Sequence, residues 1–179
     1  MKKLNMSVLP LIHAEYNSPE CAEYLVMEIV RLTPERQEGL KLFLHNLKDG
    51  GDDEFFSPHS TDDLSISKIA TQNSKDLYYL IVEGKQVIGY GLLRGWDEGY
   101  AIPSLGMAIH PLVRGIGLGK LFMNFLHMLA FRRGASKVRL RVNKKNDKAI
   151  SLYKGLGYVF NDDIKQAEYL VGLKNLGSE

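Results

Sequence analysis

Three glycines at alternate positions stand directly before an amphipathic segment, in the run Arg114-Gly115-Ile116-Gly117-Leu118-Gly119. Glycine has no Cβ, so such a run can turn several backbone N–H groups toward one point. The first N–H groups of a helix have no intrahelical acceptor, and the helix dipole adds partial positive charge there. The run is therefore typical of a loop that binds a phosphate or diphosphate, and Arg114 adds a cation beside it.

The spacing of this run excludes the two commonest phosphate loops. The dinucleotide pattern GxGxxG requires glycine at position 120, where the chain has Lys120. The P-loop pattern GxxxxGK[ST] requires glycine at position 114 and a hydroxyl at 121, where the chain has Arg114 and Leu121. A diphosphate loop of another type is expected.

A second pattern follows at Asn146-Asp147-Lys148-Ala149-Ile150-Ser151-Leu152-Tyr153-Lys154-Gly155-Leu156-Gly157-Tyr158. It resembles the Asn-x-x-Ala-x-x-x-Tyr-x-x-x-Gly-Phe/Tyr segment of the GNAT superfamily of N-acetyltransferases. The run 114–119 resembles that superfamily's Arg/Gln-x-x-Gly-x-Gly/Ala signature. The two signatures enclose a predicted strand and cover roughly residues 104–158, and the order of elements extends the likeness loosely over about 27–173.

The resemblance implies a protein that binds acetyl-CoA. Backbone amides of residues 114–119 would hold the coenzyme diphosphate, and the strand 107–109 would bind the pantetheine arm like an added strand. Asn146 would hydrogen-bond the same arm, beside a possible role as a helix N-cap. The expected cofactor-binding residues are Met107, Ala108, Ile109, Arg114, Gly115, Ile116, Gly117, Leu118, Gly119 and Asn146.

The resemblance also implies the chemistry, in which a neutral primary amine attacks the thioester carbonyl directly. Tyr153 would be the general acid that protonates the leaving thiolate, and a backbone N–H of the 107–109 strand would stabilise the oxyanion. A primary amine has a pKa near ~10, so a base must take its proton. Some relatives carry a glutamate five residues before the asparagine, where this chain has Arg141. Glu98 or its neighbour Asp97 is the expected substitute, and His59 is a weaker one.

The acceptor pocket is expected to involve the first 75 residues and the loop 94–104. Trp96 and Tyr100 are expected either to line this pocket or to pack in the core or at the rim. Arg141 either holds an acidic group of the acceptor or is an ordinary surface arginine. The acceptor itself is an unidentified amine of a small molecule, an amino sugar or a protein. Because the glutamate is missing at position 141, a catalytically inactive CoA-binding regulatory module stays open as the alternative.

The pattern of apolar residues predicts an α/β fold, a mixed sheet of about seven strands flanked by about four helices. A GNAT-like domain spans 27–179 and follows an extension of uncertain structure, 1–26. The resemblance implies that the strand around 107–109 splays away from the strand 136–142. Gly106 is expected to form a bulge. Strands are expected over 27–32, 77–83, 86–94, 100–109, 136–142, 158–160 and 167–173, and helices over 33–47, 61–70, 118–129 and 146–156.

Composition narrows the class of protein further. The chain has 179 residues, of which 45% are hydrophobic and 25% charged, as in a folded soluble domain. Its one cysteine, Cys21, excludes an internal disulfide and a thiolate metal cluster, and no metal is expected. No membrane segment or signal core is recognisable, so a cytoplasmic protein is expected. Residues 114–154 hold eleven Lys or Arg and one acid, Asp147, and this excess of positive charge favours binding of a polyanion. No specific nucleic acid is expected. A homodimer is compatible with the resemblance.

Overall fold

A computed structural model describes residues 26–71 and 74–177. Among them, seven strands form one mixed sheet, as the sequence predicts. The order of the strands in the sheet is β1-β2-β3-β4-β5-β7-β6. The strands are β1 (Met27–Arg31), β2 (Leu77–Glu83), β3 (Gln86–Arg94), β4 (Ser104–Ile109), β5 (Lys137–Asn143), β6 (Val159–Asp162) and β7 (Tyr169–Asn175). The helices are α2 (Gln37–Asp49), α3 (Asp63–Thr71), α4 (Leu118–Arg132) and α5 (Asp147–Gly155), with short 3-10 turns η2 (Pro34–Arg36), η3 (Asp52–Glu54) and η4 (Pro111–Val113).

The expected extension over residues 1–26, apart from Val26, lies outside the described residues, and so does Cys21. None of the helices in the described part of the chain is long and apolar enough to cross a membrane.

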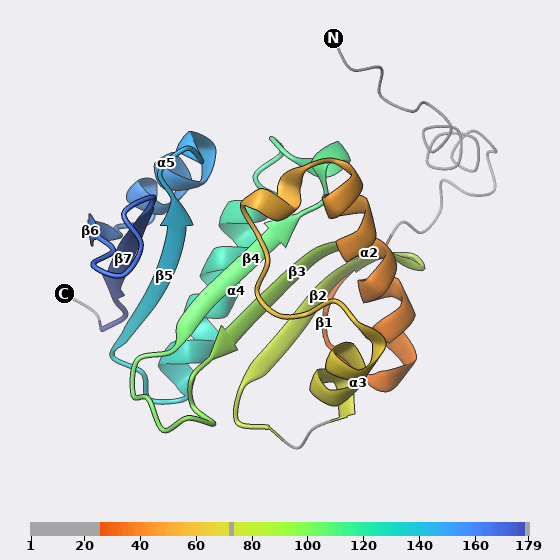
Figure 1. The fold of residues 1–179 in the computed structure, drawn as a ribbon. Coiled ribbons are helices and arrows are strands. Elements are labelled where there is room, and N and C mark those ends of the chain that lie inside the picture. The colour runs from red at the N-terminus through yellow and green to blue at the C-terminus, as the bar shows by residue number, and fades with distance from the viewer. Residues whose placement is uncertain (1–25, 72–73, 178–179) are drawn as a thin grey trace, which may run out of the picture.

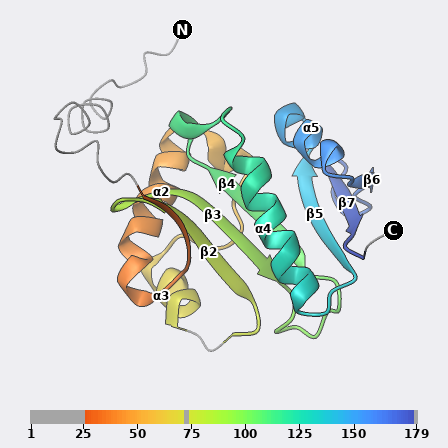
Figure 2. The same cartoon turned by 180° about the vertical axis from the view of Figure 1, so that it is seen from behind.

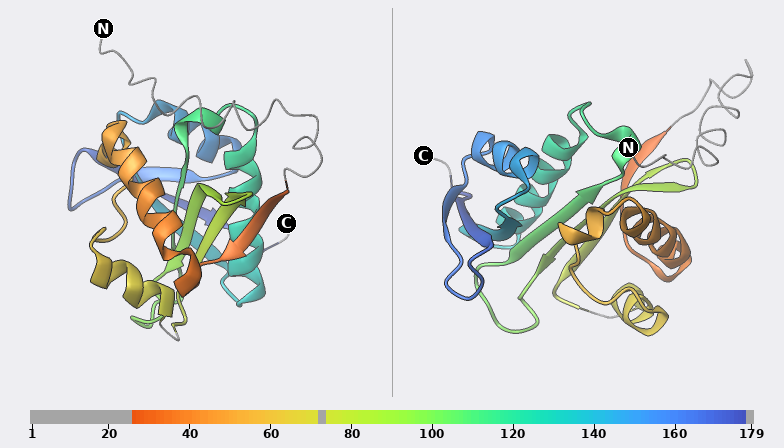
Figure 3. Two further views of the ribbon diagram at one scale, coloured as in Figure 1. Left: turned by 90° about the vertical axis from the view of Figure 1, so that its right-hand side faces the viewer. Right: turned by 45° about the horizontal axis from the view of Figure 1, so that its top comes forward.

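Two layers of helices enclose the sheet (Figures 1 and 2). Helices α2 and α3 cover one face, and α4 and α5 cover the other. Figure 3 shows the same three layers from two further sides. Strand β2 contributes to both cores, because Leu77 and Ile81 point toward α4 while Tyr78, Leu80 and Val82 point toward α2. This double burial explains why its sequence is an almost continuous apolar run rather than an alternating one.

Local signals set the ends of several elements. Gly84 has a φ of 57° and closes the hairpin between β2 and β3. Asp62 caps α3, since its Oδ1 accepts a hydrogen bond of 2.9 Å from the Ser65 N–H. The helix expected over 33–47 starts as the 3-10 turn η2 after Thr33, and α2 begins at Gln37.

Strand β4 pairs with β3 without interruption, from Ser104 opposite Arg94 to Ile109 opposite Gly89. The expected bulge at Gly106 is therefore wrong. The register shift lies instead between Ile81 and Val82, in the ladder that joins β2 to β3. A bulge requires an extra residue on one strand, and the ladder between β3 and β4 has equal numbers on both sides.

Strand β5 runs parallel to β4 but meets it at one point. Ser104 and Arg139 are the only registered pair, and the Arg139 N–H donates to the Pro103 carbonyl at 3.0 Å. Figure 1 shows the two strands side by side at this end and diverging toward their carboxyl ends. The expected splay is thus present, and it exposes one main-chain edge of β4 between the two halves of the sheet.

Gly91 in β3 lets helix α4 pack directly on the sheet. A Cβ at this position would lie 2.7 Å from Cε1 and Cζ of Phe122, a ring that is fully buried. We predict that Gly91→Ala destabilises the protein by about 1–3 kcal/mol, because the extra methyl overpacks the core. Gly155→Ala is the control, since a Cβ there meets nothing within 4 Å. The two variants are compared by urea unfolding, and equal midpoints would contradict the packing argument.

Candidate active site at the divergence of two strands

The glycine-rich loop folds as an open cradle at the start of α4. Gly115 and Gly117 have φ of 87° and 89°, the left-handed region that other residues adopt only at a cost. A Cβ on either glycine would meet nothing within 4 Å, so these positions are reserved by backbone conformation and not by crowding. Gly117 is the N-cap residue of α4, so no N-cap side chain accepts a hydrogen bond from the first turn of this helix.

The backbone N–H groups of residues 115–120 find no acceptor within the described ranges. The first helical hydrogen bond runs from the Leu121 N–H to the Gly117 carbonyl, and the Arg114 N–H donates to Pro111. The six amides between these bonds, which include those of Ile116 and Leu118, are free donors beside the positive end of the helix dipole. This arrangement fits an anion such as a diphosphate.

Gly119 serves a different purpose from the other two glycines. It lies inside the first turn of α4, where a Cβ would be 3.3 Å from Cε of Met107 and 3.4 Å from Cδ2 of Leu152. The absence of a side chain here lets α4 approach β4 and α5 closely. The third glycine therefore sets packing rather than a turn.

Arg114 holds the loop in place. Its Nε donates to the Ile109 carbonyl at 2.8 Å, and its two terminal nitrogens donate to the two carboxylate oxygens of Asp52, each at 3.0 Å. This paired geometry is the strong form of an arginine–carboxylate contact. The guanidinium is thus engaged by the protein itself, and the Arg114 N–H donates to Pro111. Arg114 therefore positions the cradle but adds no free donor to it.

Along the free edge of β4, alternate residues direct their main-chain N–H and C=O groups toward the gap between β4 and β5. The His110 N–H donates to the Ile88 carbonyl, so the antiparallel pattern directs the main-chain groups of Ala108 toward Tyr90 in β3. Met107 and Ile109 consequently direct theirs toward β5, beyond the last registered pair. Of the three strand residues expected to bind a cofactor, Met107 and Ile109 have main-chain donors on the open edge, and Ala108 has its own committed to the sheet.

Helix α5 follows β5, the strand on the other side of this gap. Asn146 caps it, since its Oδ1 accepts a hydrogen bond of 3.2 Å from the Ala149 N–H. Tyr153 is the buried residue of this helix, and burial raises its pKa to about 12. No hydrogen-bond partner for its hydroxyl exists among the described residues. Tyr153 therefore carries a protonated phenol that is not consumed by a structural contact.

The neighbouring tyrosine is used differently. The Tyr158 ring lies 5.7 Å from that of Tyr153, and its hydroxyl hydrogen-bonds Nε2 of His127 at 2.8 Å. Burial lowers the pKa of His127 to about 4, so this imidazole is neutral and belongs to the core.

A cavity of about 780 Å³ lies at the end of β4 and β5 where the two strands still pair, on the face that carries α2 and α3. Two of the expected site residues, Glu98 and Tyr100, line it from the loop between β3 and β4. The remaining lining residues are Arg94, Gly95, Ala101, Ile102, Ser104, Arg139, Val171 and Leu173.

Two other expected residues lie apart from this cavity. Trp96 packs against the core beneath α4, and the guanidinium of Arg133 lies 5.3 Å from its ring centroid. Arg141 hydrogen-bonds Oε1 of Gln166 at 2.8 Å and covers the Tyr169 ring at 4.3 Å. The structure therefore does not place Trp96 in the acceptor pocket, and it gives Arg141 partners within the protein.

The loop that carries Glu98 is fixed by Asp76, a residue that sequence reasoning missed. The buried Oδ1 of Asp76 accepts from the backbone N–H groups of Gly95, Trp96 and Asp97, at 2.9, 2.9 and 3.3 Å. Burial raises the pKa of Asp76 although these three bonds oppose the shift. Asp97 in turn accepts from Ser74 and from the Lys75 N–H, and these bonds lower its pKa. Asp97 is thus a structural carboxylate outside the cavity.

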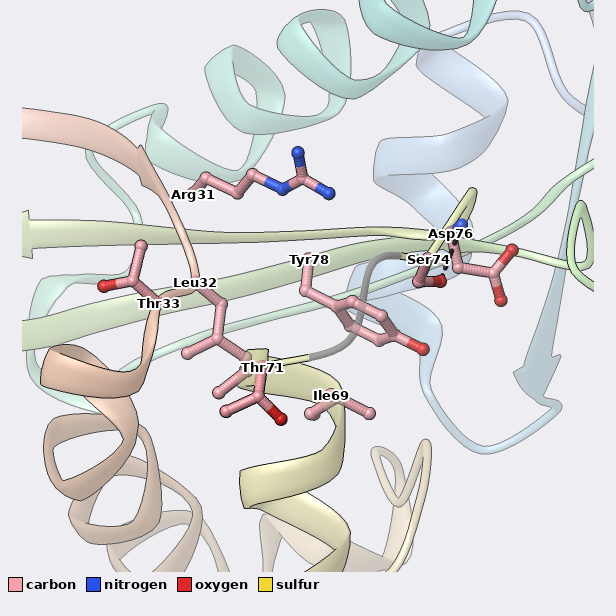
Figure 4. A pocket seen from close by; sticks show the side chains of 9 residues that line it. Arg31, Leu32, Thr33, Ile69, Thr71, Ser74, Asp76 and Tyr78 are labelled. Atoms are coloured by element: carbon pink, nitrogen blue, oxygen red, sulfur yellow. Dashed lines mark hydrogen bonds between the residues drawn. The ribbon is translucent and has the colours of Figure 1, made fainter.

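Asp76 also borders a second hollow of about 320 Å³ between β1, α3 and the start of β2 (Figure 4). Figure 4 shows the hydrogen bond from the Asp76 N–H to the Ser74 hydroxyl, with the Tyr78 ring alongside. Ser74 and Asp76, two of its polar lining residues, are held by hydrogen bonds within the chain.

Two histidines near the site have defined contacts. Nδ1 of His59, the weaker candidate base, donates to the Ser60 carbonyl, and Nε2 accepts from the buried Tyr90 hydroxyl, both at 2.7 Å. His110 lies in the turn after β4, and its Nδ1 accepts from the Leu112 N–H. Within the described residues, no three His, Cys, Asp or Glu side chains gather closely enough to hold a metal ion.

Comparison with known proteins connects this geometry to a family. Acetyltransferase SG1711 of Sodalis glossinidius (strain morsitans) is 29% identical over 89 residues, which are 50% of this chain and 61% of that protein. The GNAT domain of S. lividans PAT superposes with a TM-score of 0.71 at 14% identity, and covers 83% of this chain and 90% of that one. PaiA N-acetyltransferase from Thermoplasma acidophilum, solved in complex with coenzyme A, gives 0.68 at 18% identity, over 84% and 99%.

The structural likenesses confirm the fold. The decisive match is that of a family model, Acetyltransferase (GNAT) family, which covers residues 44–158 and so includes both sequence signatures, the splayed strands and Tyr153. Acetyl-CoA is the cosubstrate of this family. The chain belongs to the GNAT family of acetyltransferases.

Proposed function

We propose that this protein is an acetyl-CoA-dependent N-acetyltransferase that transfers an acetyl group directly to a primary amine. The observation that carries the proposal is the free edge of β4, which joins an amide cradle at one end to a large cavity at the other. An extended thioester can reach from one to the other along this edge.

The residues present fit a coenzyme with a diphosphate and an amide-containing arm. The six unpaired amides of residues 115–120 would hold the diphosphate, and the open left-handed glycines leave room for it. Met107 and Ile109 would hydrogen-bond the arm as an added strand does. The Asn146 side chain lies at the start of α5 and would reach the same arm while still capping the helix.

When bound, acetyl-CoA supplies the thioester whose acetyl group is transferred. The N–H of Met107 or Ile109 would stabilise negative charge on the carbonyl oxygen, because it is a fixed donor without a partner. Tyr153 would donate its phenolic proton to the departing sulfur. A phenol with a pKa of about 12 delivers a proton only to a strongly basic, poorly solvated group, and a thiolate in a closed slot meets that condition.

Glu98 is the carboxylate proposed to take the proton of the amine. It lines the cavity, whereas Asp97, the other acid of the loop, is held by Ser74 and Lys75. Asp76 keeps the base of the loop in position, so Glu98 is presented from a fixed support.

The cradle is tested with Gly117→Ala and Gly134→Ala. Both glycines have φ above 80° with open space around a Cβ, and they lie at opposite ends of α4. We expect Gly117→Ala to weaken acetyl-CoA and CoA binding at least tenfold, because the amides lose their common direction. Gly134→Ala controls for backbone strain alone. Isothermal titration measures both, and equal affinities would refute the cradle.

Replacing Tyr153 by phenylalanine tests the acid. We expect kcat to fall about 10²-fold or more in Tyr153→Phe with the affinity for acetyl-CoA retained, since only the proton donor is lost. The raised pKa keeps the phenol protonated to about pH 11, so wild-type activity has no alkaline limb from this residue below that pH. Tyr158→Phe, which removes the adjacent hydroxyl, is the control. Unchanged kcat in Tyr153→Phe excludes this acid.

The role of Glu98 has a pH signature. An amine with a pKa near ~10 is mostly protonated at pH 7 and mostly neutral above pH ~10. We expect Glu98→Gln to lower kcat/KM about 10²-fold at pH 7, with the deficit shrinking as the pH approaches 10. Steady-state thiol release over that range checks it, and a deficit independent of pH would assign Glu98 to binding.

The same assays separate the proposal from a CoA-binding module without activity. Such a module would bind the coenzyme, and Gly117→Ala would weaken this binding. It would not release thiol, whichever amine is offered as acceptor.

A further inference from the structure

The larger cavity contains two arginines that form no ion pair with a described carboxylate. Arg94 ends β3, Arg139 lies in β5, and both line the cavity. None of the ion pairs within the described part of the chain includes either one. Arg94 is half-buried, so its charge is partly withdrawn from water, whereas Arg139 is exposed. Two cations on a cavity wall that form no ion pair favour the binding of an anion.

Strand register brings the two arginines to one place. Arg94 lies directly opposite Ser104, and Ser104 lies directly opposite Arg139, so the three side chains form a row on one face. Neighbouring strands are about 4.8 Å apart, which separates the two arginine Cα atoms by about 10 Å. Two long guanidinium side chains at this spacing can meet above Ser104, whose hydroxyl adds a third donor.

Arg141 does not belong to this row, although it lies on the same face of β5. Its guanidinium is engaged by Gln166 and by the Tyr169 ring. The role that the sequence offered to Arg141, a contact with an acidic group of the acceptor, therefore fits Arg139 and Arg94 better.

The rest of the cavity complements the other parts of such an acceptor. Glu98 supplies a single carboxylate, which suits the ammonium form in which an amine arrives. The apolar side chains of Ile102, from the loop before β4, and of Val171 and Leu173, from β7, form a wall of the cavity. The uncharged part of the acceptor can contact this wall.

We infer that the acceptor is an amine that also carries a carboxylate or a phosphate, and that Arg94, Ser104 and Arg139 hold this anionic group. The inference rests on the proposed acetyl transfer. A polyamine lacks the anion and would place a second cation beside two arginines, so the cavity disfavours it.

The first test is a panel of matched acceptors, followed by thiol release from acetyl-CoA. It contains the amino acids, the same amino acids as carboxamides, aminoalkyl phosphates such as 2-aminoethyl phosphate, and spermidine. We expect kcat/KM for the preferred amino acid or aminoalkyl phosphate to exceed that of its uncharged partner at least tenfold. The comparison of the two anionic series identifies carboxylate or phosphate as the source of the charge.

Several outcomes overturn the inference. Carboxamides or spermidine acetylated as well as the anionic amines would refute it while acetyl transfer stands. Acetylation of uncharged amines but of no anionic amine would refute it as well. Absence of coenzyme binding, or binding without acetylation of any amine, would instead defeat the proposed function, so the two failures are distinguishable.

Variants of the row provide the second test. Arg94→Gln and Arg139→Gln should each raise KM for the anionic acceptor about ten- to hundredfold, with kcat changed less than about threefold. KM for the uncharged partner should stay unchanged, which a merely structural role would not produce. Arg132→Gln, an exposed arginine on α4, is the matched control. Equal KM values for the anionic acceptor in all variants would remove the arginines from the site.

Discussion

The site depends on the position at which two parallel neighbouring strands stop pairing. β4 and β5 share the Ser104–Arg139 pair and one hydrogen bond to Pro103, and beyond it Met107 and Ile109 face no strand. Main-chain donors and acceptors in a sheet need partners, so an internal edge of this kind is suited to an extended ligand. The cavity lies next to this break, around the last paired residues, Ser104 and Arg139. The end of the pairing is therefore the point at which the two halves of the site meet.

Much of this arrangement follows from local sequence patterns. The helical spacing of apolar residues defines α4, Asn146 caps α5, and Gly84 closes a hairpin, each within a few residues. These features could be predicted because they depend on neighbours along the chain. The direction of the main-chain groups of Ala108 could not, since it is fixed by the register of β4 against β3. The absence of a bulge at Gly106 is set by the same register.

Residues that act through distant partners were also beyond local patterns. Asp76 orders the loop of Glu98 by accepting hydrogen bonds from three amides about twenty residues away. Trp96 and Tyr100 belong to the same loop, yet one packs under α4 and the other lines the cavity. Only the path of the loop separates them. Arg94 and Arg139 become neighbours through Ser104, which no spacing in the sequence reveals.

The contact between Arg114 and Asp52 ties together two segments that a designer would treat as independent modules. Asp52 follows α2, whereas Arg114 begins the loop before α4. A chimera that replaces the region after α2 with that of a relative removes the partner of this arginine. The unpaired guanidinium would then compete with the loop amides for the phosphate groups of the coenzyme. Grafts in this scaffold must therefore exchange positions 52 and 114 as a unit.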